Sequence, residues 1–417
     1  MKILFLSDTF PPEICAGANR VFEQARYWVE QGHEVTVITC APNFPRGKIY
    51  PGYKNKWYQV EEQASIRVIR VKTFLWPNRG LILRTIDFLT YMLMSFVSGL
   101  FQEKPDIVIA TSPQLFTAVS GWLLSRCKRV PFIFELADLW PASIGAVQAL
   151  QTRLLLKIFE KLELFLYQRA EMVMALTSAF KTDLVRRKIP EKLITVIPSG
   201  VDLRHYHYRP KDENLLEQLG LKNKFVVGYI GTHGMAHGLE NILEVAYLLH
   251  EDPDIHFLFV GDGAMKPALQ ALAKEKRLTN VLFIAGQSKT EIVKYWSICD
   301  LALVHLRNEE VFSKVIPSKL LEAVAMELPV LLISPSGEAS EIVMSHEVGV
   351  WLEYGDVLQQ VEVIAQLKDN AELLAEYRRH SKQHSSQYSR DKQAQFMLDN
   401  FIKVIEKTRY QRLQPAD

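Results

Sequence analysis

Short apolar runs alternate with longer segments of helical periodicity along most of the chain. Residues 2–7, "KILFLS", and 34–39, "EVTVIT", are typical of buried strands, whereas 17–31 carries apolar residues at helical spacing. Strands that alternate with helices indicate α/β layers built on parallel sheets. In the first half we expect further strands at 106–110, 131–135 and 172–176, a β-rich stretch at 57–73, and helices at 81–101, 114–126 and 152–169.

The same pattern begins again in the second half. "KFVVGYIGTHG", which starts at Lys224, has the same pattern as "KILFLSDTFPPEICAG", which starts at Lys2. In both segments a buried strand leads into a glycine-containing loop that precedes a helix. "IHFLFVGDG", at 255–263, stands where "HEVTVIT" stood in the first half. The repeat indicates two nucleotide-type sheets in tandem.

A chain of 417 residues exceeds what one hydrophobic core usually organises. We therefore predict two Rossmann-like domains whose parallel sheets face a central cleft. The boundaries are expected to give a first domain at 1–198, a polar, proline-containing linker at 199–224, a second domain at 225–376 and an amphipathic, basic tail at 377–417. The tail is either a terminal helix packed on the domains or a solvated end.

Composition is ordinary for a globular protein, with 48% hydrophobic and 23% charged residues. The net charge of +2 hides an asymmetry, because residues 1–200 carry 25 Lys and Arg against 17 Asp and Glu, and residues 201–417 carry 24 against 30. A basic front half suggests an anionic partner such as a membrane surface or a lipid phosphate. A functionally neutral imbalance is the alternative.

The four cysteines are far apart and form no CxxC pair, so neither a zinc site nor a disulfide framework is predicted, which fits a reducing compartment. The N-terminus reaches Asp8 before an apolar segment of signal-peptide length, and a cytoplasmic protein is expected. Arg84 and Asp87 interrupt the apolar stretch at 81–101, and each would cost roughly 2.5–3.5 kcal/mol at the centre of a bilayer. We predict a helix that covers a sheet, with a helix whose outer face dips into a membrane surface as the alternative.

Special residues of the second domain gather where its strands are expected to end, which is where open α/β sheets bind ligands. Neither domain has a GxGxxG motif, so a dinucleotide redox site is not expected. The candidate donor-binding residues are Gly231, Thr232, His233, Gly234, Gly261, Gln287, Ser318, Lys319 and Glu322.

The segment "VIPSKLLEAVAMELPVLLIS" supplies three of these candidates. It predicts a helix that starts near Pro317 and is followed by a turn and a core strand. Ser318, Lys319 and the free N–H groups of the helix start would hold a diphosphate, with Lys319 as a point charge. Glu322 would accept hydrogen bonds from a ribose diol, worth roughly 1.5–3 kcal/mol. An ordinary serine-capped helix is the alternative.

Several segments in a specific order resemble a known family: "SDTFPPEICAGANRVFEQARYWVEQGHEVTVIT", "FELADLWPASI", "VIPSGVDLRHY", "GYIGTHGMAHGLENIL", "FVGDG", "IPSKLLEAVAMELPVL" and "GEASEIV". The chain is similar to the family-four retaining glycosyltransferases of the GT-B fold, and to the branch that builds bacterial surface polysaccharides and attaches amino sugars. The resemblance implies transfer of a sugar, with retention, from a nucleotide diphosphate sugar, a UDP-sugar, to a glycan or polyprenyl-diphosphate-linked acceptor. It also implies that the tail packs back on the first domain.

The resemblance assigns roles to further residues. Asp138 in "DLWP" matches the position that lines the reaction centre, although a helix cap is the alternative, and Asp138 and Lys319 are the catalytic candidates. Gly17 matches the glycine that approaches the donor diphosphate, with Glu13 and Asn19 as weaker neighbours.

Two departures from the family pattern affect the donor site. Lys314 stands where the family often has the first of two glutamates, so recognition of the donor sugar is in question. The loop "GTHGMAHG" lacks the usual Arg and Lys, which leaves His233 and His237 as its basic candidates.

No metal cofactor and no nucleic-acid partner are expected. The carboxylates of "DPD" at 252–254 precede their strand rather than end it, so this segment is interpreted as a turn. The positive front half predicts peripheral contact with the inner face of an anionic cytoplasmic membrane. A non-hydrolysing UDP-sugar epimerase and a non-catalytic nucleotide-sugar-binding scaffold are the alternative functions.

Overall fold

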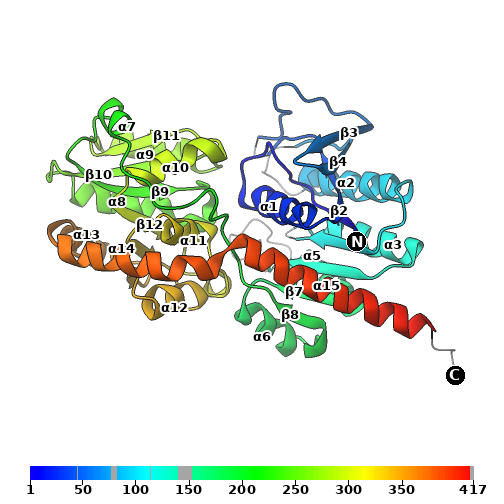
Figure 1. Ribbon diagram of the computed structural model, residues 1–417. Coiled ribbons are helices and arrows are strands. Elements are labelled where there is room, and N and C mark those ends of the chain that lie inside the picture. The colour runs from blue at the N-terminus through cyan, green and yellow to red at the C-terminus, as the bar shows by residue number, and fades with distance from the viewer. Residues whose placement is uncertain (45, 77–81, 113, 140–152, 414–417) are drawn as a thin grey trace. The chain divides into compact units, whose positions relative to one another are not determined.

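In the computed structural model the chain forms two compact units (Figure 1). The first comprises Met1–Pro198 together with the C-terminal helix α15 (Arg390–Leu413), and the second is Ser199–Ser389. The structure describes residues 1–44, 46–76, 82–112, 114–139 and 153–413. Each unit is an α/β layer structure, so the expected fold class of two Rossmann-like domains is confirmed.

The first unit is built on an eight-stranded sheet of order β3-β4-β2-β1-β5-β6-β7-β8. All its neighbouring strands are parallel except the β3–β4 hairpin. Its strands are β1 (Lys2–Leu6), β2 (Glu34–Cys40), β3 (Tyr58–Gln63), β4 (Ile66–Val71), β5 (Ile107–Thr111), β6 (Phe132–Leu136), β7 (Met172–Ala175) and β8 (Ile194–Val196). Its helices besides α15 are α1 (Ala16–Glu30), α2 (Ile82–Leu100), α3 (Leu115–Lys128), α5 (Arg153–Arg169), α6 (Ser178–Arg186) and the 3₁₀ turn η1 (Glu191–Leu193).

The predicted elements of the first half are confirmed over the residues that the structure describes. The stretch at 57–73 is the β3–β4 hairpin, and the segment at 81–101 is α2, whose first predicted residue, Leu81, lies outside the described residues. Residue 152, the predicted start of the next helix, also lies outside them. None of the described helices combines the length and the apolarity that crossing a bilayer requires.

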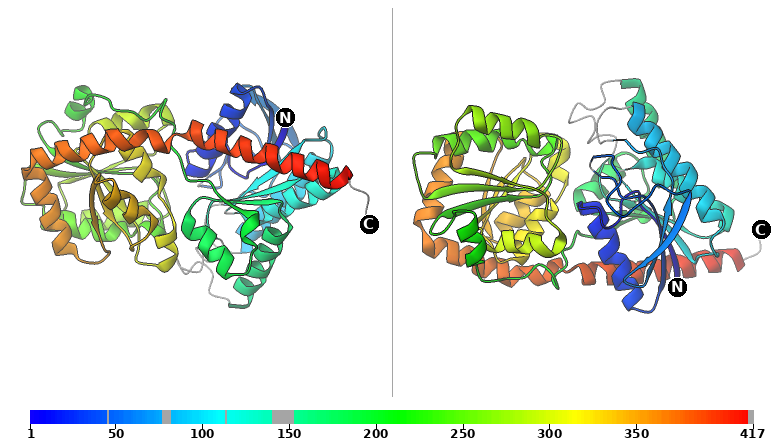
Figure 2. Two further views of the ribbon diagram at one scale, coloured as in Figure 1. Left: turned by 60° about the horizontal axis from the view of Figure 1, so that its bottom comes forward. Right: turned by 90° about the horizontal axis from the view of Figure 1, so that it is seen from above.

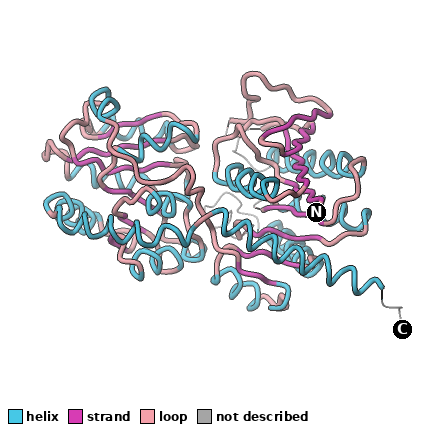
Figure 3. The backbone as a smooth tube through the Cα atoms, in the orientation of Figure 1, coloured by secondary structure: helices cyan, strands magenta, loops and turns pink. Residues whose placement is uncertain are grey.

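The second unit is built on a six-stranded, fully parallel sheet of order β11-β10-β9-β12-β13-β14. Figure 3 draws the strands of both units in magenta. Its strands are β9 (Phe225–Ile230), β10 (Ile255–Val260), β11 (Val281–Ile284), β12 (Leu301–His305), β13 (Val330–Ile333) and β14 (Gly349–Leu352). Its helices are α7 (Glu213–Gln218), η2 (Met235–His237), α8 (Leu239–Leu248), α9 (Lys266–Glu275), α10 (Lys289–Ser297), η3 (Glu310–Lys314), α11 (Ser318–Ala325), α12 (Glu338–Ser345), α13 (Val357–Asp369), α14 (Ala371–Ser385) and η4 (Ser386–Tyr388).

Alternate residues of β9 enter two separate cores in this unit. Val226 and Ile230 pack with α10 and α11 on one face, whereas Val227 and Tyr229 pack with α8 on the other. A strand buried on both faces must be apolar at nearly every position, and this is why β9 lacks the alternation of a half-exposed strand.

The expected boundaries differ from the structure at two places. The segment at 199–224 is not a free linker, because Leu216 and Leu221 are buried in the core of the second unit. The tail is divided: α14 belongs to the second unit, where the Ser381 hydroxyl donates to the Leu328 carbonyl at 3.1 Å, and α15 belongs to the first. In both segments the few buried apolar residues lie among many polar ones. A domain boundary predicted from composition therefore misses them.

Helix α15 completes the core of the first unit (Figure 2). The Phe401 ring meets Trp28 of α1 edge to face with centroids 5.4 Å apart, and the Trp28 indole N–H donates to the Ala394 carbonyl at 3.0 Å. Beside them, the buried Arg390 guanidinium donates to the Glu23 carboxylate at 2.8 Å. The helix therefore fills a volume that the rest of the first unit leaves open.

Replacing Phe401 by alanine should lower the free energy of unfolding of the first unit by about 3–5 kcal/mol, because the ring is fully buried and leaves a cavity. Phe396 lies on the same helix but is 44% exposed, so Phe396→Ala should change stability by about 0.5 kcal/mol or less. Urea denaturation followed by tryptophan fluorescence measures both. Equal losses in the two variants would contradict the packing described here.

Candidate functional site

The order of the sheet in the second unit reverses between β9 and β12, so the loops after these strands flank a topological switch point. The candidates Gly231 and Gly261 directly follow β9 and β10, and Lys319 lies in the first turn of α11. The structure thus brings together, at one edge of one sheet, residues that are far apart in sequence.

Two glycines allow the loops after β9 and β10 to touch through their backbones. A Cβ at Gly261, whose φ is +149°, would lie 1.9 Å from the Gly231 carbonyl oxygen, and a Cβ at Gly263 would lie 2.3 Å from the His233 carbonyl oxygen. The His233 N–H donates to the Asp262 carbonyl at 2.9 Å across the same contact. No other residue type fits this approach without displacing one of the loops.

Lys319 is a buried lysine at this edge. Its side chain is buried, and its Nζ lies 3.9 Å from the centroid of the Tyr229 ring and 2.5 Å from the Tyr229 hydroxyl, to which it donates. The Tyr229 hydroxyl in turn donates to the Thr232 carbonyl at 2.7 Å. Among the described residues Lys319 forms no salt bridge, and burial lowers its pKa to about 7, while Glu322 opposes that shift. An anion beside Lys319 would compensate the cost of burying its charge.

The neighbouring histidines are neutral at pH 7. Burial, together with Lys266 and Lys319, lowers the pKa of His233 to about 4, and its two ring nitrogens are buried with no hydrogen-bond partner among the described residues. Burial also holds the pKa of His237 well below its usual value. The positive potential therefore comes from Lys319 and not from the two histidines that the sequence offered as basic candidates.

Lys266, which sequence reasoning missed, ties the strand ends together. Its ammonium donates to the carbonyls of Gly261 at 2.6 Å and Ile284 at 2.7 Å, which end β10 and β11. Asp262 accepts the Gly286 N–H at 3.0 Å. The signal was a lysine one turn after "GDG". Its role here is to hold the loops in place.

The remaining candidates of the second unit lie around this edge. Ser318 and Glu322 are half-buried and one helical turn apart in α11, Thr232 is exposed, and the half-buried Gln287 donates to the Ala285 carbonyl at 2.9 Å. Lys314, at the end of η3, lies 3.4 Å from the Glu310 carboxylate. The segment at 252–254 precedes β10, and Asp252 accepts from the Asp254 N–H at 2.9 Å, which is the geometry of a turn.

In the first unit, Gly17 lies in the first turn of α1, and a Cβ there would lie 3.4 Å from the Thr9 hydroxyl oxygen, an ordinary contact. The Asn19 N–H donates to the Cys15 carbonyl at 3.1 Å within the same turn. Asp138 is half-buried just after β6, and its N–H lies 3.3 Å from the Ser112 hydroxyl. Trp140 and Pro141 of "DLWP" lie outside the described residues.

Glu13 clamps two loops of the first unit. Its carboxylate accepts the N–H groups of Asn43 and Phe44, each at 2.8 Å, and that of Phe10 at 3.1 Å. Burial raises its pKa to about 7, although these hydrogen bonds oppose the shift. Three donors occupy this carboxylate, so it shapes the loops rather than facing a ligand freely.

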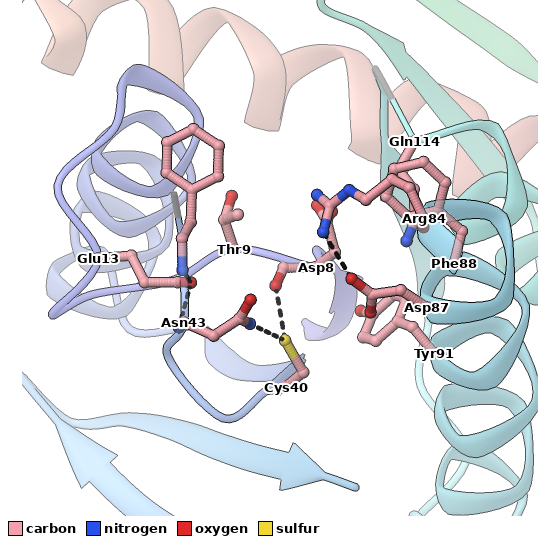
Figure 4. A pocket seen from close by; sticks show the side chains of 11 residues that line it. Asp8, Thr9, Glu13, Cys40, Asn43, Arg84, Asp87, Phe88, Tyr91 and Gln114 are labelled. Carbon is pink, nitrogen blue, oxygen red and sulfur yellow. Dashed lines mark hydrogen bonds and ion pairs between the residues drawn. The ribbon is translucent and has the colours of Figure 1, made fainter. Parts of the chain in front are cut away.

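Glu13 borders a polar pocket at the carboxyl ends of β1 and β2 (Figure 4). Asp8, Arg84 and Asp87 also line it, and sequence reasoning did not place them in a site. A charged pair within the otherwise apolar α2 was the available signal, because a helix rarely buries Arg and Asp without a partner.

Two family models match adjoining parts of the chain. The model described as Glycosyltransferase Family 4 matches residues 17–205, and the model described as Glycosyl transferases group 1 matches residues 211–384.

Among curated proteins, the chain is 26% identical over 337 residues to a putative colanic acid biosynthesis glycosyl transferase, WcaI, from Escherichia coli (strain K12), covering 78% of this chain and 81% of that protein. It is 22% identical over 419 residues to the alpha-monoglucosyldiacylglycerol synthase of Acholeplasma laidlawii, covering 98% of both. Among solved structures, Anabaena HepE in complex with UDP-glucose is similar with a TM-score of 0.74 at 19% identity, covering 97% of this chain and 100% of that one. With one family model on each unit, the chain belongs to the GT-B glycosyltransferase superfamily that the group 1 and Family 4 models describe.

Proposed function

We propose that this glycosyltransferase moves a sugar, with retention of configuration, from a UDP-sugar to a hydroxyl group on a glycan or lipid-linked acceptor in surface polysaccharide or glycolipid synthesis. The observation that carries the proposal is the Lys319 ammonium, which is buried beside Gly231 at the start of α11 and forms no salt bridge among the described residues. The similarity to a structure that contains UDP-glucose and the names of the two curated relatives support the donor and the pathway class.

Lys319, the Ser318 hydroxyl and the first N–H groups of α11 would bind the diphosphate. Glu322 would accept hydrogen bonds from the ribose diol, because a carboxylate one turn into the helix cannot approach the phosphates without repulsion. Gly231, Gly234 and Gly261 would let the backbone approach the donor, and the neutral His233 could offer one ring N–H to it.

The proposed reaction needs no enzyme nucleophile. The acceptor oxygen would attack the anomeric carbon on the face from which the diphosphate leaves, the bond between that carbon and the phosphate oxygen would break, and the acceptor proton would pass to the departing diphosphate. Lys319 would stabilise the charge that develops on the leaving group, and Asp138 would orient the acceptor hydroxyl. Lysine and helix N–H groups would supply the potential that a metal ion supplies elsewhere.

Affinity for UDP should fall as pH rises from 7 to 9, by roughly tenfold per pH unit at most. The pKa of Lys319 is lowered to about 7, so above this pH the free protein has lost the ammonium that the diphosphate needs. Isothermal titration at several pH values measures the effect. In the same range Lys319→Met should bind weakly and independently of pH, whereas Lys274→Met, which changes an exposed lysine of the same unit, should behave as the wild type. A flat wild-type profile would contradict this role for Lys319.

Incubation with a panel of UDP-sugars, with and without polyprenyl-diphosphate-linked sugars, tests the function. We expect transfer in the presence of the lipid-linked acceptor and slow donor hydrolysis without it, and both should survive EDTA. Loss of transfer with chelator, restored by Mg²⁺ or Mn²⁺, would refute the metal-independent mechanism. Conversion of UDP-N-acetylhexosamine without an acceptor would identify an epimerase, and UDP binding without turnover would identify a scaffold.

The proposal includes peripheral contact with an anionic membrane through α2. Exposed Ile86, Leu89, Leu93 and Val97 recur along one face of this helix, and the adjoining Phe101 is 83% exposed. Near the end of the helix the Lys128 ammonium donates to the Leu100 carbonyl at 2.9 Å. The exposed cations Lys104, Arg126 and Arg129 lie in the segments that follow α2 and end α3. An apolar stripe beside cations suits the interface of an anionic bilayer.

Liposomes that contain anionic lipid should co-sediment the protein at low salt and release it as salt rises. Leu93→Gln should weaken binding several-fold, because it removes an apolar contact from the stripe. Leu358→Gln changes a comparably exposed leucine of the second unit and should leave binding unchanged. Binding that ignores lipid charge and salt, or that weakens equally in both variants, would refute docking through α2.

A further inference from the structure

The loop that connects β2 to the edge strand β3 is basic along its whole length. Residues 41–57 contain four cationic side chains, and the chain has no Asp or Glu between Glu34 and Glu61. All four cations are exposed: Arg46, Lys48, Lys54 and Lys56. The three lysines form no salt bridge among the described residues. Their charge is therefore available to an anionic partner.

Contacts within the first unit hold this loop in one shape. The Tyr53 N–H donates to the Tyr50 carbonyl at 3.1 Å, and the Arg70 guanidinium lies over the Tyr53 ring, 5.0 Å from its centroid. The Asn55 side chain pairs twice with the backbone of Thr73, donating to its carbonyl at 2.7 Å and accepting its N–H at 3.1 Å. A loop that is already ordered loses little conformational entropy when it binds.

Aromatic and apolar side chains accompany the cations. Trp57, which ends the loop, is 67% exposed, and the Lys72 ammonium lies 4.4 Å from the centroid of its ring. The pairing of Tyr58 with Val71 in the β3–β4 hairpin places these two residues opposite each other. Tyr58 and Ile49 are exposed as well. Amphipathic rings beside cations suit the boundary between lipid headgroups and acyl chains.

The segment after β4 connects this surface to the outer face of α2. The Phe74 N–H donates to the Thr90 hydroxyl of α2 at 2.9 Å, and the exposed Phe74 ring stacks on Trp76 with centroids 6.3 Å apart. The exposed Ile86 and Leu93 lie one helical turn from Thr90 on either side. Cations and an apolar stripe thus share one surface. A soluble polyanion has no apolar phase to cover the stripe, whereas a bilayer has both.

We propose that the surface formed by Lys48, Lys54, Lys56, Trp57 and Lys72 binds the phosphates of an anionic phospholipid bilayer, with the Trp57 ring among the headgroups. The continuity with α2 rests on the proposed function, whereas the charge and exposure of the loop stand without it. The loop supplies electrostatic attraction, and α2 supplies apolar area. Two contacts fix the orientation of the first unit on the bilayer, because a single contact leaves rotation about it free.

Co-sedimentation of the full chain with phosphatidylcholine vesicles, with and without phosphatidylglycerol, tests the electrostatic part. The triple variant Lys48→Gln, Lys54→Gln, Lys56→Gln should bind the anionic vesicles at least about tenfold more weakly at low salt. The matched control Lys222→Gln, Lys274→Gln, Lys294→Gln changes three exposed lysines of the second unit and should bind as the wild type does. An unchanged midpoint of urea denaturation will show that each variant is folded.

The exposed Trp57 also reports its own depth. Anionic vesicles with brominated acyl chains should quench part of the wild-type tryptophan fluorescence. Trp57→Phe should remove most of that quenching while the variant still sediments with the vesicles, because phenylalanine keeps an apolar ring at the same place.

Three outcomes would overturn the assignment. The triple variant sediments as the wild type does, Trp57→Phe leaves the quenching unchanged, or the wild type binds soluble polygalacturonate but no vesicle, which would identify an acidic glycan as the partner. If Leu93→Gln weakens binding and the triple variant does not, the loop is refuted and the contact through α2 stands. A wild type that sediments through the loop but transfers sugar from no UDP-sugar would refute the proposed function and leave the lipid-binding surface in place.

Discussion

The proposed donor site depends on one close approach, between the backbones that follow β9 and β10. A Cβ at Gly261 would overlap the Gly231 carbonyl oxygen, so two strand ends can meet only where a side chain is missing. This contact encloses His233 and leaves space beside Gly231 for the Lys319 side chain. Burying an ammonium that forms no salt bridge among the described residues is costly, which lowers the pKa of Lys319, and the surrounding backbone holds its side chain in place. The same fixed arrangement preorganises the charge for an anionic ligand.

Each unit places a polar site at the switch point of its own sheet, but the two sites differ in their ionisable groups. The edge beside β9 combines Lys319 with the start of α11, whereas the pocket beside β1 contains more carboxyl groups than cations. Electrostatics would therefore favour a diphosphate at the second unit over the first.

The sequence was sufficient where the signal is local. Continuous apolar runs predicted β1 and β9, and a proline before Ser318 and Lys319 predicted the start of α11. It was insufficient where a few anchors lie among polar residues, as with Leu216 and Leu221 in the presumed linker. The pocket could not be predicted from the sequence, because Asp8, Asn43 and Arg84 meet only after α2 has packed on the sheet. Their spacing along the chain follows no helical or strand period. The neutral state of His233 could not be predicted either, because its lowered pKa results from burial in the folded protein.

Helix α2 is mostly apolar but contains the charged residues Arg84 and Asp87, and its two faces explain this combination. At about 100° per residue, Arg84, Asp87, Phe88 and Tyr91 fall on one face and Ile86, Leu89, Leu93 and Val97 on the opposite one. The first set lines the pocket, and the second is exposed. Arg84 and Asp87 form an ion pair on the inner face. The two charges that argue against a membrane span are therefore absent from the exposed face. The outer face can therefore be apolar while the inner face is polar, and the proposed membrane contact uses the outer face alone.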